Sequence, residues 1–282
     1  MPDLHLGLIG DNIKQSSTPR LHRLAGLQNG LDVQYDSLIP PEMNKTFDQV
    51  FDACQSGSYR GINITYPYKE IATQHVEIED AQVRRIGAIN TVVFSSHGPR
   101  GYNTDYSGFL DAYRKERGHM PPDRVLLVGT GGVGRAIAFG LLTLGARDIR
   151  LTDCDPERAH GLASDLRAAA PAGTNITVGD TVDDLAQGVE GLVNCTPVGM
   201  VGYGGTAIPT TAMRDATWAF DAVYTPIHTQ FLREAAQAGL QVISGYELFF
   251  FQGVNAWDIF AGHPLDQALL RADLNAPAPA PL

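Results

Sequence analysis

The chain of 282 residues is expected to fold into two α/β domains, and three observations predict this fold class. Short apolar segments typical of strands alternate with helical patterns, as they do in parallel and mixed sheets. The segment Gly-His-Met-Pro-Pro at 118–122 interrupts this alternation and indicates the entry into a second domain. A glycine-rich turn then directly follows a buried strand, which is typical of nucleotide-binding sheets.

The first domain, from roughly residue 1 to 106, begins with short alternating elements. Its strands are expected at 4–9, 33–39, 61–65 and 90–94. Its helices are expected at 18–30, at 43–56, and from Pro67 or Tyr68 onward. This alternation favours a sheet that has helices against its faces.

The second domain, from about 107 to 244, begins with a strand–helix–strand unit of normal length. That unit is expected to have strands at 124–128 and 149–152 and a helix at 131–144. Further strands are expected at 189–194, 219–223 and 241–243. Residues 245–282, with an apolar helix at 247–260, are expected to fold back onto the first domain and complete it. The last residues, 275–282, are expected to fray.

The formal charge of the chain is −10, from 21 basic and 31 acidic side chains. This charge opposes non-specific binding to nucleic acid or anionic lipid, so neither is an expected partner. No apolar run approaches the roughly 18 residues of a membrane-spanning helix, and no signal peptide is visible. Cys54, Cys154 and Cys195 lack the spacing of metal ligands. We therefore expect a reduced, cytoplasmic protein without a metal site.

The glycine-rich turn matches the dinucleotide fingerprint G-x-G-x-x-G at Gly129, Gly131 and Gly134. The first glycine permits the tight turn, the second lets the backbone approach the pyrophosphate, and the third allows close packing of helix and strand. An apolar strand precedes the turn and a helical run follows it, which is the context that this motif requires. The second domain is therefore expected to be a Rossmann-type domain.

The next strand of that unit ends at an acid, Asp153, 19 residues after Gly134. A carboxylate at this place accepts the ribose hydroxyls of NAD, whereas it repels the 2′-phosphate of NADP. Asp155 adds a second acid. Arg158 is the opposing signal, because a guanidinium could bind a phosphate; it could also line the adenine or pair with one of the acids. We expect NAD to be preferred over NADP.

Polar groups are concentrated in four segments outside the fingerprint. They are Ser16-Ser-Thr18-Pro19-Arg-Leu-His22, Asn63-Ile-Thr65-Tyr-Pro67-Tyr-Lys69, Gly87-Ala-Ile-Asn90-Thr91 and Asn103-Thr-Asp105. Hydroxyl and amide groups of this kind pair with ligand hydroxyls, so a polyhydroxylated carboxylic acid suits them better than an apolar ligand. His22 has no charged partner in its motif and is interpreted as structural.

These segments, in this order, resemble the shikimate dehydrogenase family, which includes the quinate/shikimate dehydrogenases. The resemblance extends through nearly the whole chain. It includes the glycine fingerprint, Asn194-Cys-Thr-Pro-Val-Gly-Met200, Asp221-Ala-Val-Tyr224-Thr-Pro226, and Gly245 with Gln252. It implies an oxidoreductase whose active site lies in the cleft between the two domains, so domain opening and closing is expected.

The resemblance also implies roles for individual residues. Lys69 and Asp105 are expected to be the catalytic pair, and which of them carries the proton stays open. Substrate contacts are expected from Ser16, Thr18, Thr65, Asn90, Tyr224 and Gln252. Cofactor contacts are expected from Gly129, Thr130, Gly131, Gly132, Val133, Gly134, Asp153, Arg158, Thr196, Pro197, Val198, Met200, Val223 and Gly245.

The sequence departs from the family pattern in a few places. Thr18 replaces a serine, a change that we associate with members that accept quinate as well as shikimate. Asp153-Cys-Asp155 stands where NADP-type members carry Asn-Arg-Thr, and so resembles the NAD-using quinate/shikimate branch. Gln15 stands where many members have His, and Leu248 where many have Met.

The expected reaction is NAD-dependent interconversion of shikimate or quinate with its 3-dehydro acid. Three alternatives stay open: the same chemistry on a related ring acid such as aminoshikimate, a sensing module that binds quinate or shikimate without turnover, and a different two-domain enzyme such as a folate dehydrogenase. The segments around Ser16 and Asp105 argue against the last. The sequence leaves open whether the chain is a monomer or a homodimer, and in which direction the reaction runs in the cell.

Overall fold

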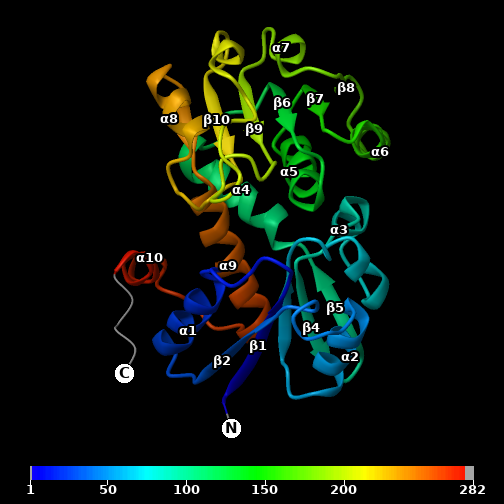
Figure 1. Cartoon of the computed structure of the whole chain (residues 1–282), viewed down its shortest axis with the longest axis vertical. Coiled ribbons are helices and arrows are strands. Elements are labelled where there is room, and N and C mark those ends of the chain that lie inside the picture. Colours follow the sequence, from blue (N-terminus) through cyan, green and yellow to red (C-terminus); the bar gives the residue numbers. More distant parts are fainter. Residues whose placement is uncertain (1, 277–282) are drawn as a thin grey trace. The chain divides into compact units, whose positions relative to one another are not determined.

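The structure is a computed structural model, and it describes residues 2–276. The chain divides into two compact units (Figure 1). The first unit contains residues up to Thr104 and residues from Gln252 onward, and the second runs from Asp105 to Phe251. The domain limits expected from the sequence lay at 106 and 245. The second division falls inside one continuous helix, α9 (Gly245–Ala261).

The sheet of the first unit has five strands in the order β2-β1-β3-β4-β5. Three strands run parallel: β2 (Val33–Leu38), β1 (Leu4–Ile9) and β3 (Gly61–Ile64). The other two, β4 (Thr91–Ser95) and β5 (Gly98–Tyr102), form an antiparallel hairpin beside β3. The sheet is therefore mixed, which is one of the two kinds that the alternation of strands and helices allowed.

Apolar side chains cover both faces of this sheet. Leu6 and Leu8 of β1 face a cluster that includes Trp257 and residues from α1 (Thr18–Gln28). The next residue along the strand, Ile9, faces the opposite cluster, which is formed with α2 (Phe47–Ser56) and α3 (Ala81–Ile86). Leucines alternate with His5 and Gly7 along β1, so one face of the strand carries most of its apolar side chains. The unit is completed by α10 (Gln267–Asn275), which packs on α1.

The second unit has six strands, all parallel, in the order β11-β10-β9-β6-β7-β8. Its strands are β6 (Arg124–Val128), β7 (Asp148–Thr152), β8 (Asn175–Val178), β9 (Gly191–Asn194), β10 (Trp218–Asp221) and β11 (Gln241–Ile243). From β6 the chain first builds outward through β7 and β8, and then returns to build the other half from β9. The order of the strands reverses between β6 and β9, and at such a point α/β sheets bind their ligands.

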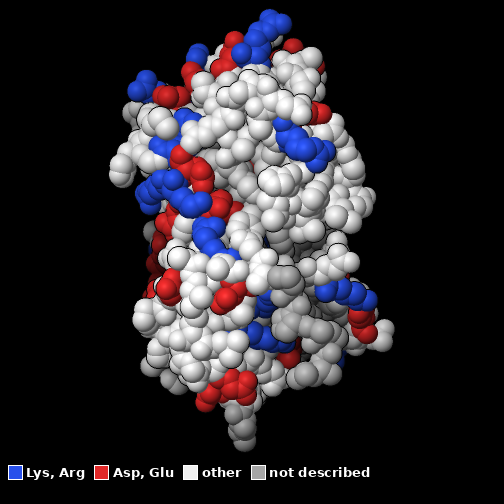
Figure 2. All heavy atoms as spheres, turned by 90° about the vertical axis from the view of Figure 1, so that its left-hand side faces the viewer, with Lys and Arg blue, Asp and Glu red and all other residues white. Residues whose placement is uncertain are grey.

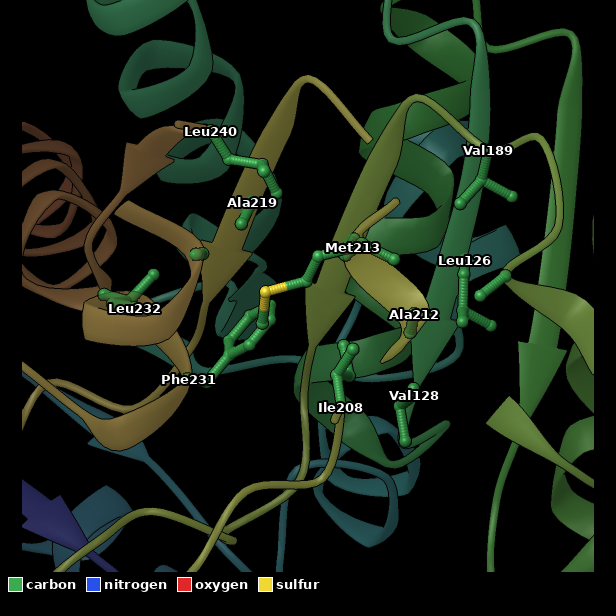
Figure 3. Close-up of a cluster of buried hydrophobic side chains, with 13 residues drawn as sticks. Leu126, Val128, Val189, Ile208, Ala212, Met213, Ala219, Phe231, Leu232 and Leu240 are labelled. Atoms are coloured by element: carbon green, nitrogen blue, oxygen red, sulfur yellow. The ribbon is translucent and has the colours of Figure 1, made fainter. Parts of the chain in front are cut away.

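Helices cover the two faces of the second sheet. They are α4 (Thr104–Arg117), α5 (Gly132–Thr143), α6 (Pro156–Ala169), α7 (Val182–Leu185) and α8 (Gln230–Gln237), together with the short 3-10 helix η2 (Thr210–Met213). Figure 3 shows one core, in which Phe231 and Leu232 of α8 and Met213 of η2 gather near Leu126 and Ala219 of the sheet. On α4, Phe109 meets Phe220 of β10 edge to face, with ring centroids 5.1 Å apart.

Several elements differ from the sequence-based predictions. The helix expected from Pro67 or Tyr68 is a turn followed by a 3-10 helix, η1 (Ile71–His75), and α3 begins only after its cap, Asp80. The helix expected at 43–56 begins at Phe47, where Thr46 and Gln49 form a capping box. The strands β5 and β8 and the helices α4, α6, α7 and α8 were not predicted. The frayed tail expected at 275–282 lies mostly outside the described residues.

Charges of both signs are interspersed on the surface in Figure 2, with Lys and Arg side chains among Asp and Glu. None of the helices formed by residues 2–276 is long and apolar enough to cross a membrane. Within the same residues, no group of three or more His, Cys, Asp or Glu side chains is arranged to hold a metal ion.

Candidate functional site

The polar segments of the first unit meet at one edge of its sheet. The parallel strands β1 and β3 both end at this edge, where they are followed by Gly10 and Thr65. The antiparallel strand β4 begins there, after Asn90, and β5 ends there, before Asn103. The topology therefore gathers side chains that are far apart in the sequence, which the spacing alone could not show.

The loop after β1 presents two hydroxyl groups at the start of α1. The Ser16 hydroxyl accepts a hydrogen bond from the Thr18 N–H (3.3 Å) and donates to the Thr18 hydroxyl (3.1 Å). In this chain of bonds the Thr18 hydroxyl is the acceptor, so its own hydrogen is left to point at a ligand oxygen. Thr18 is buried, and Pro19 fixes the first turn of the helix behind it.

The loop after β3 carries Thr65 and Lys69. Gly10 is needed here, because a Cβ at that position would lie 2.3 Å from Cγ2 of Thr65. The two loops are also joined through the Tyr68 hydroxyl, which donates to the Asp11 carboxylate (2.6 Å). Lys69 is buried, and its backbone carbonyl accepts a hydrogen bond from the Ile89 N–H (2.9 Å). The lysine backbone is thus fixed between two loops of the same edge.

Asn90 holds the start of α4. Its Oδ1 accepts hydrogen bonds from the Thr104 N–H (2.7 Å) and hydroxyl (3.1 Å), and its Nδ2 donates to the same hydroxyl (2.9 Å). Asp105 is the next residue, in the first turn of α4, and is also buried. The amide that we expected to contact the substrate therefore fixes the backbone beside Asp105, a role that the sequence analysis missed.

Each of the three fingerprint positions of the second unit is occupied by glycine for a different physical reason. Gly129 has a φ of +95°, which a residue with a side chain rarely adopts. At Gly134 a Cβ would lie 2.0 Å from the Gly129 carbonyl oxygen, so helix α5 packs on the turn only with glycine there. At Gly131 the nearest atom would be 3.9 Å away, on the Arg158 guanidinium. The open space beside Gly131 fits the approach of a pyrophosphate to the backbone.

Asp153 follows β7 and is bonded to the glycine turn. Its carboxylate accepts from the Thr130 N–H (2.6 Å), from the Thr130 hydroxyl (2.8 Å) and from the Asp155 N–H (3.0 Å). Burial by itself would raise the pKa of the Asp153 carboxyl, but these hydrogen bonds outweigh burial and hold the pKa below its usual value. The carboxylate therefore stays ionised at neutral pH.

The other acid of this turn, Asp155, has a structural role: its side chain caps α6 by accepting from the Glu157 N–H (3.1 Å). Arg158, in the first turn of the same helix, brings positive charge beside Gly131. These residues, with the helix N-terminus of α5 behind the turn, fit a dinucleotide at the carboxyl end of β6.

The remaining expected cofactor contacts lie on two loops that follow β9 and β10. Thr196, Pro197, Val198 and Met200 are on the first loop, and Val223 is on the second. Gly245 lies against this second loop, since a Cβ there would be 2.4 Å from the Val223 carbonyl oxygen. Tyr224 stacks on Phe249 with ring centroids 4.9 Å apart. Gln252 lies on α9, in the part of that helix that belongs to the first unit.

A parallel sheet with a glycine turn at its switch point, joined to a second sheet that gathers a lysine, hydroxyls and amides at one edge, defines the class of NAD(P)-binding α/β oxidoreductases. Comparison with known proteins narrows this class. Residues 8–92 match the model of the shikimate dehydrogenase substrate-binding domain.

Relatives match over almost the whole chain. A quinate/shikimate dehydrogenase (NAD⁺) of Corynebacterium efficiens is 34% identical over 95% of this chain and 96% of its own length. A shikimate dehydrogenase (NADP⁺) of Pseudarthrobacter chlorophenolicus is 35% identical over 95% of this chain and 92% of its own. The solved structure of quinate dehydrogenase from Corynebacterium glutamicum in complex with NAD has a TM-score of 0.87 and 32% identity, covering 96% of this chain and 98% of that one.

The chain belongs to the shikimate dehydrogenase family and is an oxidoreductase of the alcohol dehydrogenase type. The resemblance drawn from the sequence motifs is confirmed. Because relatives of similar identity are named for NAD⁺ and for NADP⁺, membership of the family leaves the cofactor preference and the exact substrate undetermined.

Proposed function

We propose that this enzyme interconverts shikimate with 3-dehydroshikimate, or quinate with 3-dehydroquinate, and that it uses NAD in preference to NADP. The observation that carries the substrate class is the gathering of Ser16, Thr18, Thr65 and Lys69 at one edge of the first sheet. This edge offers an amine and hydroxyl groups, which suit a ring acid that carries several hydroxyl groups. The names of the relatives support the same class.

The carboxylate of the acid is assigned to the Ser16–Thr18 pair. Their hydroxyl chain ends in a free Thr18 hydrogen, and a charge-assisted hydrogen bond to a carboxylate is stronger than one between neutral groups. The ring hydroxyls are assigned to Thr65, Lys69 and Asp105, with Asn90 holding the backbone next to Asp105. Tyr224 and Gln252 are proposed as further substrate contacts.

Lys69 and Asp105 are proposed as the catalytic pair. In the oxidation, a bound nicotinamide would supply the acceptor for the hydride of the alcohol carbon, whose C–H bond breaks. The hydroxyl O–H bond breaks in the same reaction, its electrons complete the carbonyl, and its proton goes to the Lys69 amine. Asp105 orients the lysine and the substrate hydroxyl. In the reverse direction the Lys69 ammonium returns the proton.

The preference for NAD is proposed from Asp153. Its hydrogen bonds hold an ionised carboxylate at the end of β7, where the adenosine ribose lies in this class of domain. A 2′-phosphate there would meet like charge. Arg158 faces Gly131, so we assign its positive charge to the pyrophosphate.

A deuterium-transfer experiment tests this function. Shikimate and quinate carrying deuterium on the carbon to be oxidised are each incubated with the protein and NAD. We expect the label to appear in the reduced cofactor and the 3-dehydro acid to form, with a slower rate than for the unlabelled acid. Binding of NAD and of an acid without any transfer would instead indicate a sensing module, and transfer only from another ring acid would replace the substrate.

A further inference from the structure

Two polar side chains of the second unit, Asn194 and Asp221, are fully buried and have no role in the function proposed above. Asn194 is the last residue of β9, and Asp221 is the last residue of the neighbouring strand β10. Each begins a loop: residues 195–200 after β9, and residues 222–226 after β10. These two loops carry most of the cofactor contacts that are not on the glycine turn.

We propose that Asn194 and Asp221 are a positioning pair that holds these two loops in the arrangement that binds the nicotinamide half of the dinucleotide. This inference rests on the proposed function, because it takes the residues of these loops to be the cofactor contacts that the sequence predicts for an NAD-dependent dehydrogenase. Neither residue is proposed to touch the reacting atoms, so both act through the backbone that they fix.

The pair joins the two loops directly. The Asn194 Nδ2 donates to Asp221 Oδ1 (2.9 Å) and also to the Val198 carbonyl in its own loop (3.2 Å). The same Asp221 Oδ1 accepts from the Val223 N–H in the other loop (3.0 Å). One amide hydrogen bond between two side chains therefore connects the backbone at Val198 to the backbone at Val223.

The opposite ends of the two side chains complete the network. Asn194 Oδ1 accepts from the Thr196 N–H (3.0 Å) and hydroxyl (2.7 Å). Asp221 Oδ2 accepts from the hydroxyl of Thr229 (2.6 Å), which caps helix α8. Each of these buried polar atoms thus takes part in a hydrogen bond. Removing one partner would leave the other without a hydrogen bond in the interior, which lowers the free energy of unfolding more than the loss of an exposed hydrogen bond does.

The network is expected to survive loss of the negative charge of Asp221, because its contacts are hydrogen bonds that a neutral side chain of the same shape can also make. Burial raises the pKa of Asp221 to about 6, against the opposing effect of its hydrogen bonds from Thr229, Val223 and Asn194. All three contacts of Asp221 are accepted bonds, two at Oδ1 and one at Oδ2. An asparagine keeps the Oδ1 acceptor, and its Nδ2 can donate to the Thr229 oxygen after the threonine hydroxyl rotates. Asp221→Asn is therefore expected to preserve the loops, whereas Asp221→Ala is not.

The test compares Asp221→Ala, Asp221→Asn and Asn194→Ala with the wild type, each as the full chain. The first readout is the Kd of NADH, measured by the change in its fluorescence. We expect Asp221→Ala and Asn194→Ala to raise this Kd by about ten-fold or more, which corresponds to the loss of one or two buried hydrogen bonds. Asp221→Asn is expected to recover most of the affinity.

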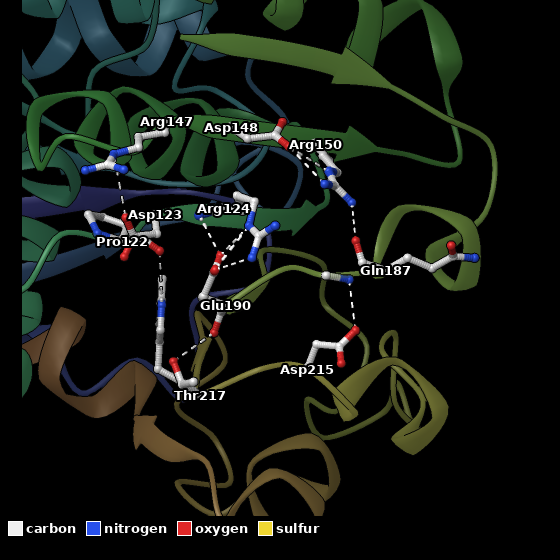
Figure 4. Close-up of polar contacts among 12 residues, drawn as sticks. Pro122, Asp123, Arg124, Arg147, Asp148, Arg150, Gln187, Glu190, Asp215 and Thr217 are labelled. Carbon is white, nitrogen blue, oxygen red and sulfur yellow. Dashed lines mark hydrogen bonds and ion pairs between the residues drawn. The ribbon is translucent and has the colours of Figure 1, made fainter.

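A matched control separates positioning from general stability. Glu190 lies just before β9, at the opposite end of the strand from Asn194, and binds Arg124 through its backbone N–H (3.0 Å) and its Nε (3.1 Å), as Figure 4 shows. Glu190→Gln is expected to weaken this contact in the same sheet, and it does not touch the loops. We expect this variant to keep the Kd of NADH within about two-fold of wild type. Equal losses of affinity in Glu190→Gln and Asp221→Ala would overturn the proposal.

Hydrogen exchange provides a readout that needs neither cofactor nor turnover. In the wild type the amides of Thr196 and Val223 are expected to exchange slowly, and Asp221→Ala and Asn194→Ala are expected to speed their exchange selectively. Fast exchange in the wild type would overturn the proposal even if the alanine variants failed to fold. Unchanged Kd values for NADH in alanine variants that fold would also overturn the proposal. A failure of Asp221→Asn to recover the affinity for NADH would do the same. If the wild type binds no NADH but shows this exchange pattern, the proposed function fails while the pairing of the loops stands.

Discussion

The Asp153 carboxylate accepts two hydrogen bonds from Thr130, one from its backbone N–H at 2.6 Å and one from its hydroxyl at 2.8 Å. This relationship ties the end of β7 to the glycine turn that follows β6. It fixes the position of the carboxylate and, together with the Asp155 N–H, keeps it ionised. The residue proposed to select the cofactor is therefore hydrogen-bonded to the turn proposed to bind the pyrophosphate.

Replacing Asp153 is expected to relax the choice of cofactor. Asp153→Asn keeps acceptor and donor groups near Thr130 but removes the charge that repels a 2′-phosphate. We expect kcat/KM for NADP to rise relative to that for NAD by about ten-fold, as for the removal of one close like charge. Initial rates with each cofactor measure this ratio.

The control for this variant is Asp123→Asn. It removes the same charge just before β6, at the opposite end of that strand, and asparagine tolerates the positive φ of 59° found there. A ratio of NADP to NAD efficiency that shifts equally in both variants would show that overall charge, and not the position of Asp153, sets the preference.

Removing the Lys69 amine is expected to stop chemistry and spare cofactor binding. Lys69→Ala should lower kcat by about 10² to 10⁴-fold, the usual contribution of a general acid or base. The Kd of NADH should stay near its wild-type value, because the residues proposed to contact the cofactor are on the second unit. Lys14→Ala is the matched control, since Lys14 is an exposed lysine of the same unit that pairs with Glu42 (2.7 Å). A Lys69→Ala enzyme with normal kcat would remove the lysine from the mechanism.

The Thr18 hydroxyl is expected to contribute to the binding of the acid. Thr18→Val has nearly the same shape but lacks the hydrogen that the Ser16–Thr18 chain leaves for a ligand. We expect KM for the acid to rise by about ten-fold with little change in KM for NAD, the effect of one buried hydrogen bond. Thr18→Ser keeps the donor and should behave like wild type. If Thr18→Ser loses as much as Thr18→Val, packing of the methyl group and not the hydroxyl explains the effect.

The free energy of unfolding should decrease as the pH is lowered, because of His22. This side chain is buried among Tyr35, Trp257 and Phe260. Burial lowers the pKa of His22 from 6.5 to about 3, with a smaller opposing effect of Asn63. Below the unfolded pKa the unfolded chain takes up a proton that the folded chain does not, so folding stability is lost as the pH falls. Between about pH 7 and about pH 5 this residue should cost about 2 kcal/mol.

Denaturant unfolding of the wild type and His22→Leu at the two pH values isolates this effect. The packing change in the variant is the same at both pH values, so it cancels in the difference between them. The variant is expected to lose about 2 kcal/mol less than the wild type on acidification. Equal losses would show that His22 becomes protonated in the folded state.

The sequence predicted most elements that have a strong apolar pattern, and the misses have physical causes. The strand β5, Gly-Pro-Arg-Gly-Tyr, has a low strand propensity, but it lies at the edge of its sheet, where a proline is tolerated. After Pro67 the chain has polar residues and one buried alanine, Ala72, in its 3-10 helix, so no amphipathic helix forms. Helix α9 is mostly apolar in both units, and nothing in its pattern marks the point at which it passes from one unit to the other.

The sequence predicted some parts of the candidate site and missed others. The glycine turn and Asp153 follow from local spacing, because a strand, a turn and a helix place them. The structural roles of Asn90 and of the Asn194–Asp221 pair did not follow, since each depends on side chains that meet only when two strands lie side by side. A polar residue at the last position of an otherwise apolar strand was the available signal for Asn194 and Asp221.

The most direct test of the central claim is a set of initial rates with shikimate and with quinate, each with NAD and with NADP. We expect turnover of at least one acid, with NAD well above NADP, and the ratio of the rates with the two acids then gives the preferred substrate. Turnover with NADP well above NAD would contradict the role assigned to Asp153. No turnover with either acid, in a protein that binds NADH, would contradict the proposed reaction.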